Sequence, residues 1–216
     1  PGHRAFKRYF QKFNQSTNQR VFTSLYQWFF NNLQFDNFTL DFDSTVLTRY
    51  GNQQGAKKGY NPQKPGRSSH HPLMAFVAEC RMIANCWLRS GDCHTTNNFL
   101  SFLEDTLDKF KGKKVSLIRA DSGFYDKEIM DYLEGKQLSY IIACRLIYPI
   151  KLKLAYHKLW LKLDEGIEIA ETTYQAENWE SPRRLIMVRQ EISKRPQAAG
   201  KQLRLFEEEE IYKNYR

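Results

Sequence analysis

Seven short apolar segments between residues 38 and 144 limit the fold more than any other feature of the sequence. Five are rich in β-branched and aromatic residues and are predicted strands: residues 38–47, 73–79, 82–89, 115–120 and 139–144. Two have apolar residues at three- and four-residue steps and are predicted helices: residues 96–110 and 127–133. Because the order is strand, strand, strand, helix, strand, helix, strand, we expect an α/β fold with a mixed sheet flanked by helices.

The regions on either side differ from this central part. Residues 1–35 contain no acidic residue and five Lys or Arg, and their aromatic residues recur at helical spacing, with a helix expected over 24–32. We interpret the aromatic stripe as core packing and the basic face as a candidate DNA contact. Residues 148–192 alternate apolar and polar positions, which predicts antiparallel strands. The expected parts are a helical basic segment (1–35), an α/β core (36–147) and a β-rich insertion (148–216).

Composition narrows the class of partner. The net charge of +9 and the acid-free stretch between Ser44 and Ala78 favour a polyanion such as nucleic acid, although ribosomal and membrane-surface proteins are also basic. The longest apolar stretches are about ten residues, roughly half of what a membrane-spanning helix needs. None of the four cysteines has the spacing of a zinc knuckle or a redox motif. We therefore expect a cytoplasmic protein with no membrane contact.

Two aspartates carry the candidate chemistry. Asp43 and Asp121 each stand at the end of an apolar strand and are followed by a small residue. Carboxylates on adjacent strand ends can converge on divalent cations, and Mg²⁺ prefers oxygen ligands. Two such ions would activate an attacking oxygen and stabilise a leaving oxygen. Taken singly, each aspartate also fits a turn or a helix cap.

The segment between the aspartates is basic and rich in turn residues. Lys57, Lys58, Lys64 and Arg67 are candidate phosphate contacts, and Tyr60 adds an aromatic ring. Contacts to phosphates position DNA without reading its sequence. The alternative is a solvated loop without a special role.

Three motifs together resemble the DDE transposases of bacterial insertion sequences. They are Asp43-Ser44-Thr45, the stretch from Gly59-Tyr60-Asn61-Pro62 through Gly66-Arg67-Ser68 to His71-Pro72, and the strand from Arg119 to Phe124. The turn Arg89-Ser90-Gly91-Asp92 is similar to the Arg-Pro-Gly-Asn turn of the family, with Ser and Asp at two positions. The resemblance extends over residues 30–216.

The resemblance implies an RNase H-like fold, two Mg²⁺ ions that Mn²⁺ can replace, and a catalytic triad of Asp, Asp and Glu. Asp43 would be the first acid and Asp121 the second, both as metal ligands, and Arg119 would join the DNA contacts. The third acid is expected beyond Arg216, so the 216 residues alone are expected to be inactive. The partners implied are double-stranded DNA, at the element ends and the target, and a second copy of the chain.

Two other functions stay open. Asp41 and Asp43 in Thr39-Leu40-Asp41-Phe42-Asp43-Ser44-Thr45 also resemble the first motif of haloacid dehalogenase-like phosphatases, with Asp41 as nucleophile and Asp43 as acid and base. That interpretation leaves the stretch from Tyr60 to Pro72 unexplained. The other alternative is a catalytically inactive transposase remnant that only binds DNA.

Overall fold

The computed structural model describes residues 2–34, 37–110 and 112–191. Two compact units, Pro1–Cys144 and Arg145–Arg216, divide the chain. The division of the chain into three parts that the sequence predicts stays a prediction. The basic linker over 193–204 and the acidic run Glu207–Glu210 lie outside the described residues.

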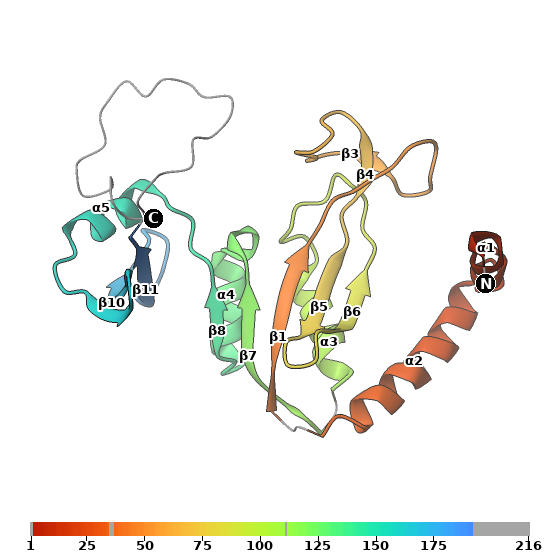
Figure 1. Ribbon diagram of the computed structural model, residues 1–216, viewed down its shortest axis with the longest axis horizontal. Helices are drawn as coiled ribbons and strands as arrows, with labels where there is room; N and C mark the ends of the chain where they lie inside the picture. Colours follow the sequence, from red (N-terminus) through yellow and green to blue (C-terminus); the bar gives the residue numbers. More distant parts are fainter. Residues whose placement is uncertain (1, 35–36, 111, 192–216) are drawn as a thin grey trace. The chain divides into compact units, whose positions relative to one another are not determined.

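The first unit is built around a five-stranded sheet in the order β6-β5-β1-β7-β8 (Figure 1). β5 is antiparallel to both β1 and β6, whereas β7 is parallel to both β1 and β8. The strands are β1 (Asn37–Ser44), β5 (Leu73–Val77), β6 (Met82–Trp87), β7 (Lys114–Ala120) and β8 (Tyr140–Ile142). The predicted α/β fold with a mixed sheet is confirmed, and its RNase H-like character stays a prediction.

Helices α3 (Phe99–Asp108) and α4 (Lys127–Gly135) pack on one face of this sheet (Figure 1). β1 alternates strictly, so that Phe38, Leu40 and Phe42 are buried against the helices. The Phe42 ring lies 5.2 Å from the Phe99 ring in an edge-to-face arrangement. Asp41 and Asp43 alternate with these residues and therefore point to the opposite face.

The pairing of β1 with β7 contains a β-bulge. Phe38 pairs with Val115, but the next residue, Thr39, pairs with Leu117, so Ser116 is an extra residue in β7. The Ser116 hydroxyl donates a hydrogen bond of 3.1 Å to the carbonyl oxygen of Phe38. After the bulge the strands stay in register up to the pair of Phe42 and Ala120.

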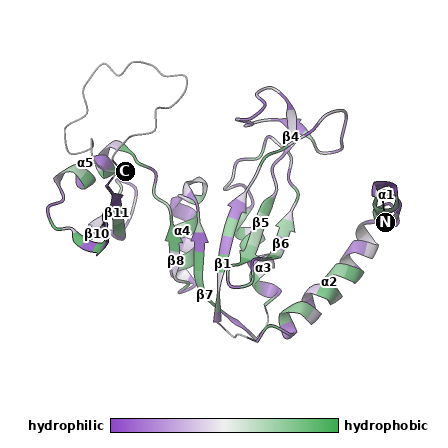
Figure 2. Cartoon of the chain, viewed as in Figure 1, coloured by the Kyte–Doolittle hydropathy of each residue, from purple (hydrophilic) through white to green (hydrophobic). Residues whose placement is uncertain are grey.

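A second, small sheet follows the end of β1 and includes part of the basic stretch that is rich in turn residues. Its order is β2-β4-β3, with β2 (Leu47–Thr48), β3 (Lys57–Lys58) and β4 (Ser68–His70). The strands are only two or three residues long because Gly, Pro and Asn interrupt them. The loops around β4 are largely hydrophilic (Figure 2).

The N-terminal residues form α1 (His3–Phe10) and α2 (Gln15–Asn31). α2 begins well before the helix predicted over 24–32, because the Asn14 side chain accepts a hydrogen bond from the Thr17 amide at 2.8 Å and caps it. The predicted core packing holds for Phe30, which is 2% exposed. It is wrong for α1, of which no described residue is buried.

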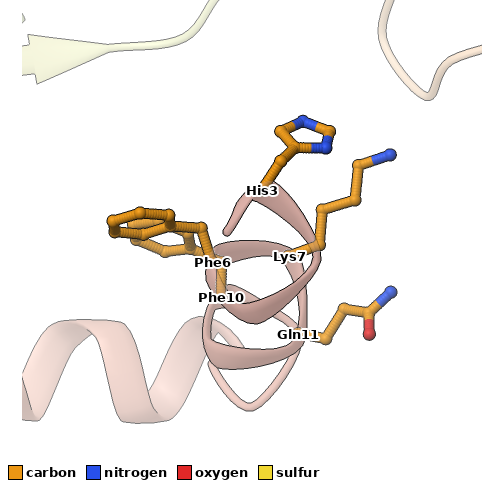
Figure 3. A pocket seen from close by; sticks show the side chains of 5 residues that line it. All are labelled: His3, Phe6, Lys7, Phe10 and Gln11. Atoms are coloured by element: carbon orange, nitrogen blue, oxygen red, sulfur yellow. The ribbon is translucent and has the colours of Figure 1, made fainter. Parts of the chain in front are cut away.

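α1 also lines a shallow pocket. Phe6 and Phe10 project from the same side of the helix, and the other lining residues are His3, Lys7 and Gln11 (Figure 3). No carboxylate lines this pocket, so it offers no acidic ligand for a metal ion.

The second unit contains α5 (Tyr148–Tyr156) and an antiparallel sheet in the order β11-β10-β9. Its strands are β9 (Leu161–Asp164), β10 (Ile167–Tyr174) and β11 (Arg183–Gln190), which confirms the β-rich C-terminal part. The helix over 148–156 corrects the expectation of strands there, since Pro149 at the start of a helix has a suitable backbone angle and needs no N–H partner. The Trp179 ring is buried and packs against Tyr174.

Across the described ranges, no helix combines the length and the hydropathy that a membrane span requires.

Candidate active site

Asp43 and Asp121 lie at adjacent positions near the carboxyl ends of two neighbouring parallel strands. Phe42 of β1 and Ala120 of β7 are the last register pair, so the two aspartates occupy the next position on their strands. Neighbouring strands lie about 4.7–4.9 Å apart. Both residues are exposed. The convergence of these carboxylates on a metal ion stays a prediction, with which the pairing of the two strands is compatible.

Each of these carboxylates is held by one backbone amide. The Ser44 N–H donates to Oδ1 of Asp43 at 2.7 Å, and the Gly123 N–H donates to Oδ1 of Asp121 at 2.9 Å. The second bond caps the short helix η1 (Ser122–Phe124). Within the described ranges no hydrogen bond or ion pair engages Oδ2 of either aspartate. One oxygen of each side chain thus remains available to a cation.

Asp41 lies on the same face of the sheet as Asp43, but its carboxylate is bound by Arg119. The Arg119 guanidinium donates from Nε to Oδ1 at 2.6 Å and from Nη2 to Oδ2 at 2.7 Å. These hydrogen bonds raise the pKa of Arg119 above its ordinary value. Both oxygens of Asp41 are engaged, which makes it a poor nucleophile and a poor metal ligand. The guanidinium of Arg119 faces a carboxylate, so its predicted DNA contact would have to compete with this pair.

Ser44, His71 and Thr95 form a polar cluster beside the aspartates that the sequence did not predict. The Ser44 hydroxyl is 3.1 Å from the Thr95 hydroxyl and 3.2 Å from Nε2 of His71. The only signal in the sequence was the His71-Pro72 motif, which carried no assigned role. Thr95 lies outside every motif that the resemblance uses.

The basic stretch packs closely against the turn at Gly91, and a glycine stands on each side of this contact. A Cβ on Gly59 would overlap the carbonyl of Gly91, and a Cβ on Gly91 would overlap the carbonyls of Lys57 and Ser69. Asn61 is buried, and its side chain donates to the Thr48 hydroxyl at 2.9 Å. The glycines of the two motifs therefore permit a close approach of backbones that no other residue would allow.

The predicted phosphate contacts differ in their surroundings. Lys58, Tyr60, Lys64 and Arg67 are exposed, and Arg67 also lies over the Tyr50 ring at 5.6 Å. Lys57 forms an exposed ion pair with Asp92 at 3.2 Å. Hydrogen bonds from Ser90 and then from Lys57 lower the pKa of Asp92.

The donor set fits a hard divalent cation but is incomplete. Two carboxylates in register, each with an open oxygen, match the one or two carboxylates by which Mg²⁺ is usually bound. Among the described residues, no group of three His, Cys, Asp or Glu side chains is placed to hold a metal ion. Within the part of the chain that the structure describes, no third acid joins Asp43 and Asp121.

The chain is similar to known transposases. The family model for the transposase DDE domain, group 1, matches residues 2–215. None of the curated proteins matches the chain. One similar structure is the piggyBac transposase synaptic complex with hairpin DNA, at 14% identity and a TM-score of 0.44, covering 81% of this chain and 38% of that one.

A second similar structure is the strand transfer complex of the Drosophila P element transposase. It has 12% identity and a TM-score of 0.33, and the match covers 65% of this chain and 37% of that one. The chain thus spans less than two-fifths of either transposase. With the family model matching nearly all of its residues, the chain belongs to the family of transposase DDE domains, group 1.

Proposed function

We propose that this chain is part of a DNA transposase that cuts DNA at the ends of an insertion sequence and joins those ends to target DNA. The observation that carries the proposal is the placement of Asp43 and Asp121 at adjacent positions of parallel strands, each with one carboxylate oxygen open. Family membership supports the same reaction class.

In this proposal Asp43 and Asp121 would hold two Mg²⁺ ions through their open oxygens. When bound, such ions polarise a phosphodiester and stabilise the charge of attacking and leaving oxygens. The backbone amides of Ser44 and Gly123 keep each carboxylate in one orientation, so its open oxygen is already directed before DNA arrives. Water first attacks the phosphorus at the element end, and the 3′-oxygen leaves as a hydroxyl. That 3′-hydroxyl then attacks a phosphorus of the target, whose own 3′-oxygen leaves, so one site serves both cleavage and joining.

The basic stretch would grip the DNA backbone beside this site. Lys58, Lys64 and Arg67 are exposed cations that can release counterions from phosphates. The Tyr60 ring is 74% exposed and can stack on a base or a sugar. Binding by this stretch is expected to be largely independent of sequence.

The proposal includes a homodimer on double-stranded DNA, because strand transfer joins paired ends, and a cytoplasmic, nucleoid-associated location. Catalysis would also need a third acid, the Glu of the family pattern. The 216 residues alone are therefore expected to bind DNA without cutting it.

The test replaces each acid by its neutral isostere in the full-length natural protein. Asp43→Asn and Asp121→Asn should each abolish Mg²⁺-dependent cleavage of DNA carrying the element ends, while DNA binding stays close to that of the parent. Asp164→Asn is the matched control, since Asp164 is an exposed aspartate at a strand end whose Oδ1 also accepts the next amide, at 2.7 Å.

Each alternative function has its own outcome in this test. Retained cleavage in either isosteric variant would refute the assignment of the acids. DNA binding without cleavage by the unaltered protein would indicate an inactive remnant. Hydrolysis of a simple phosphomonoester that depends on Asp41 would indicate a phosphatase, although Arg119 engages both oxygens of that residue.

A further inference from the structure

Arg89 connects the segments on which the polar cluster stands. Its side chain is 8% exposed. Nε donates to the carbonyl oxygen of His71 at 3.0 Å, and Nη1 donates to those of Thr95 at 3.3 Å and Asn97 at 2.6 Å. A buried guanidinium that bonds carbonyls of both segments fixes His71 and Thr95 relative to each other.

The side chains that Arg89 positions meet at Ser44. Nδ1 of His71 lies 2.8 Å from the carbonyl oxygen of Cys93, which can only accept, so this nitrogen carries the proton. With the proton on Nδ1, Nε2 can accept from the Ser44 hydroxyl at 3.2 Å. Ser44 has no second proton, so the Thr95 hydroxyl donates to it at 3.1 Å. The hydrogen bonds therefore run in one direction, from Thr95 through Ser44 to His71.

Thr95 also lies against the segment that carries Asp121. A Cβ built on Gly123 would be 3.2 Å from Cγ2 and 3.3 Å from Oγ1 of Thr95, and 3.0 Å from Oδ1 of Asp121. Gly123 is the residue whose amide holds Asp121, as Ser44 is the residue whose amide holds Asp43. Thr95 therefore forms a hydrogen bond with one residue that orients a carboxylate, Ser44, and lies beside the other, Gly123.

We propose that Thr95, held by Arg89 and coupled through Ser44 to His71, is a positioning residue that sets the separation and orientation of Asp43 and Asp121 for metal binding. The inference rests on the proposed function, because it concerns the same pair of acids. It assigns a role to the His71-Pro72 motif and to Arg89, which the reaction scheme leaves without one.

Removing the Thr95 hydroxyl should loosen the metal site more than the fold. Groups that support metal ligands from outside typically change metal affinity by about 10–100-fold when they are removed. We expect Thr95→Val, which keeps the shape of the side chain, to weaken Mn²⁺ binding by roughly tenfold. Thr95→Ser keeps the hydroxyl and should restore binding to within about threefold, since one neutral hydrogen bond accounts for most of the effect.

The experiment measures Mn²⁺ binding to the full-length protein by electron paramagnetic resonance, without DNA, together with the Mg²⁺ concentration for half-maximal cleavage. Thr96→Val is the matched control, because the Thr96 hydroxyl contacts only the exposed His94 ring within the described residues. Thermal unfolding and DNA binding of every variant are recorded, so that a folding defect is recognised. Ser44→Ala provides a second variant that breaks the same hydrogen bonds.

We expect weaker Mn²⁺ binding in Thr95→Val and Ser44→Ala and parent-like Mn²⁺ binding in Thr96→Val. The affinity for DNA should stay unchanged in all three variants. Unaltered Mn²⁺ binding in both variants, when Asp43→Asn abolishes it, would overturn the role of Thr95 and leave the proposed function intact. Unaltered binding in Asp43→Asn as well would overturn the proposed function itself.

Discussion

Arg119 of β7 and Asp41 of β1 are partners in the parallel register and form a two-pronged ion pair on the open face of the sheet. Asp43, the next residue of β1 on that face, is held only by the Ser44 amide. Two aspartates of one motif therefore have opposite surroundings, and only Asp43 has an oxygen available to a cation.

This contrast predicts that the two aspartates differ in function. Asp41→Asn should keep at least a third of the parent cleavage rate, because the amide still fills the same space beside Arg119. Asp43→Asn should reduce the rate to background. The measurement is Mg²⁺-dependent strand cleavage by the full-length protein. The reverse order of effects would make Asp41 the first acid.

The exposed cations of the basic stretch should account for part of the salt dependence of DNA binding. We expect a weaker salt dependence in the triple variant Lys58→Ala, Lys64→Ala, Arg67→Ala. The negative slope of the logarithm of the binding constant against the logarithm of the salt concentration should become shallower by about 0.9 for each phosphate that is no longer neutralised. Lys136→Ala, at the end of α4 beside the Tyr132 ring, is the control. Fluorescence anisotropy over a series of salt concentrations gives both slopes. An unchanged slope in the triple variant would exclude this stretch from the interface.

Gly91 should be irreplaceable for packing reasons. Its Cβ would overlap backbone atoms of Lys57 and Ser69, so Gly91→Ala should lower the free energy of unfolding by about 1–3 kcal/mol. Gly135, at the end of α4, has nothing within 4 Å of its Cβ position, and Gly135→Ala should be neutral or slightly stabilising. Thermal denaturation compares the two. Equal effects would mean that the contacts of Gly91 with Lys57 and Ser69 are not tight in solution.

Asp105 should make stability depend on pH in the acid range. Burial acts to raise its pKa, but hydrogen bonds from Lys109, Asn85 and Trp87 outweigh this and lower it. Because the pKa is lower in the folded state, the stabilisation is present above the unfolded value of about 3.9 and disappears as the pH falls through the folded value. Asp105→Asn should cost about 1 kcal/mol at pH 7, through weaker hydrogen bonds.

The difference between the parent and Asp105→Asn should then shrink below about pH 4, where the parent carboxylate becomes protonated. Urea denaturation at several pH values measures this difference. A gap that stays constant down to about pH 2 would show that the carboxylate charge has no part in stability.

The five strands of the large sheet and the helices α3 and α4 could be predicted from the sequence, because alternating burial and helical spacing are local patterns. The roles of Asp43 and Asp121 stay predictions. The helix α5 could not be predicted, because the apolar residues over 148–156 fit no single period and only Pro149 indicates the start of a helix. The strands β3 and β4 could not be predicted either, because strands of two or three residues in a stretch rich in Gly and Pro have no pattern of their own.

The cluster around Ser44 could not be predicted for a different reason. Its hydrogen bonds join residues that are 27 and 51 positions apart, and Ser, Thr and His are common in loops. The Asp41–Arg119 pair also depends on strand register, which motifs do not encode. These contacts arise only when β1, β5 and β7 are side by side.

The bulge at Ser116 has a consequence for how such chains diverge. If β7 continued from the pair of Phe38 and Val115 without it, Asp43 would stand opposite Ala120, and Asp121 would be displaced along the strand by one position. A homologue could keep both aspartate motifs unchanged and still place the two aspartates at different levels of the sheet. A single residue inserted in β7 without a compensating bulge would be enough. The register between β1 and β7, rather than the presence of the two motifs, would then distinguish active transposases from inactive ones.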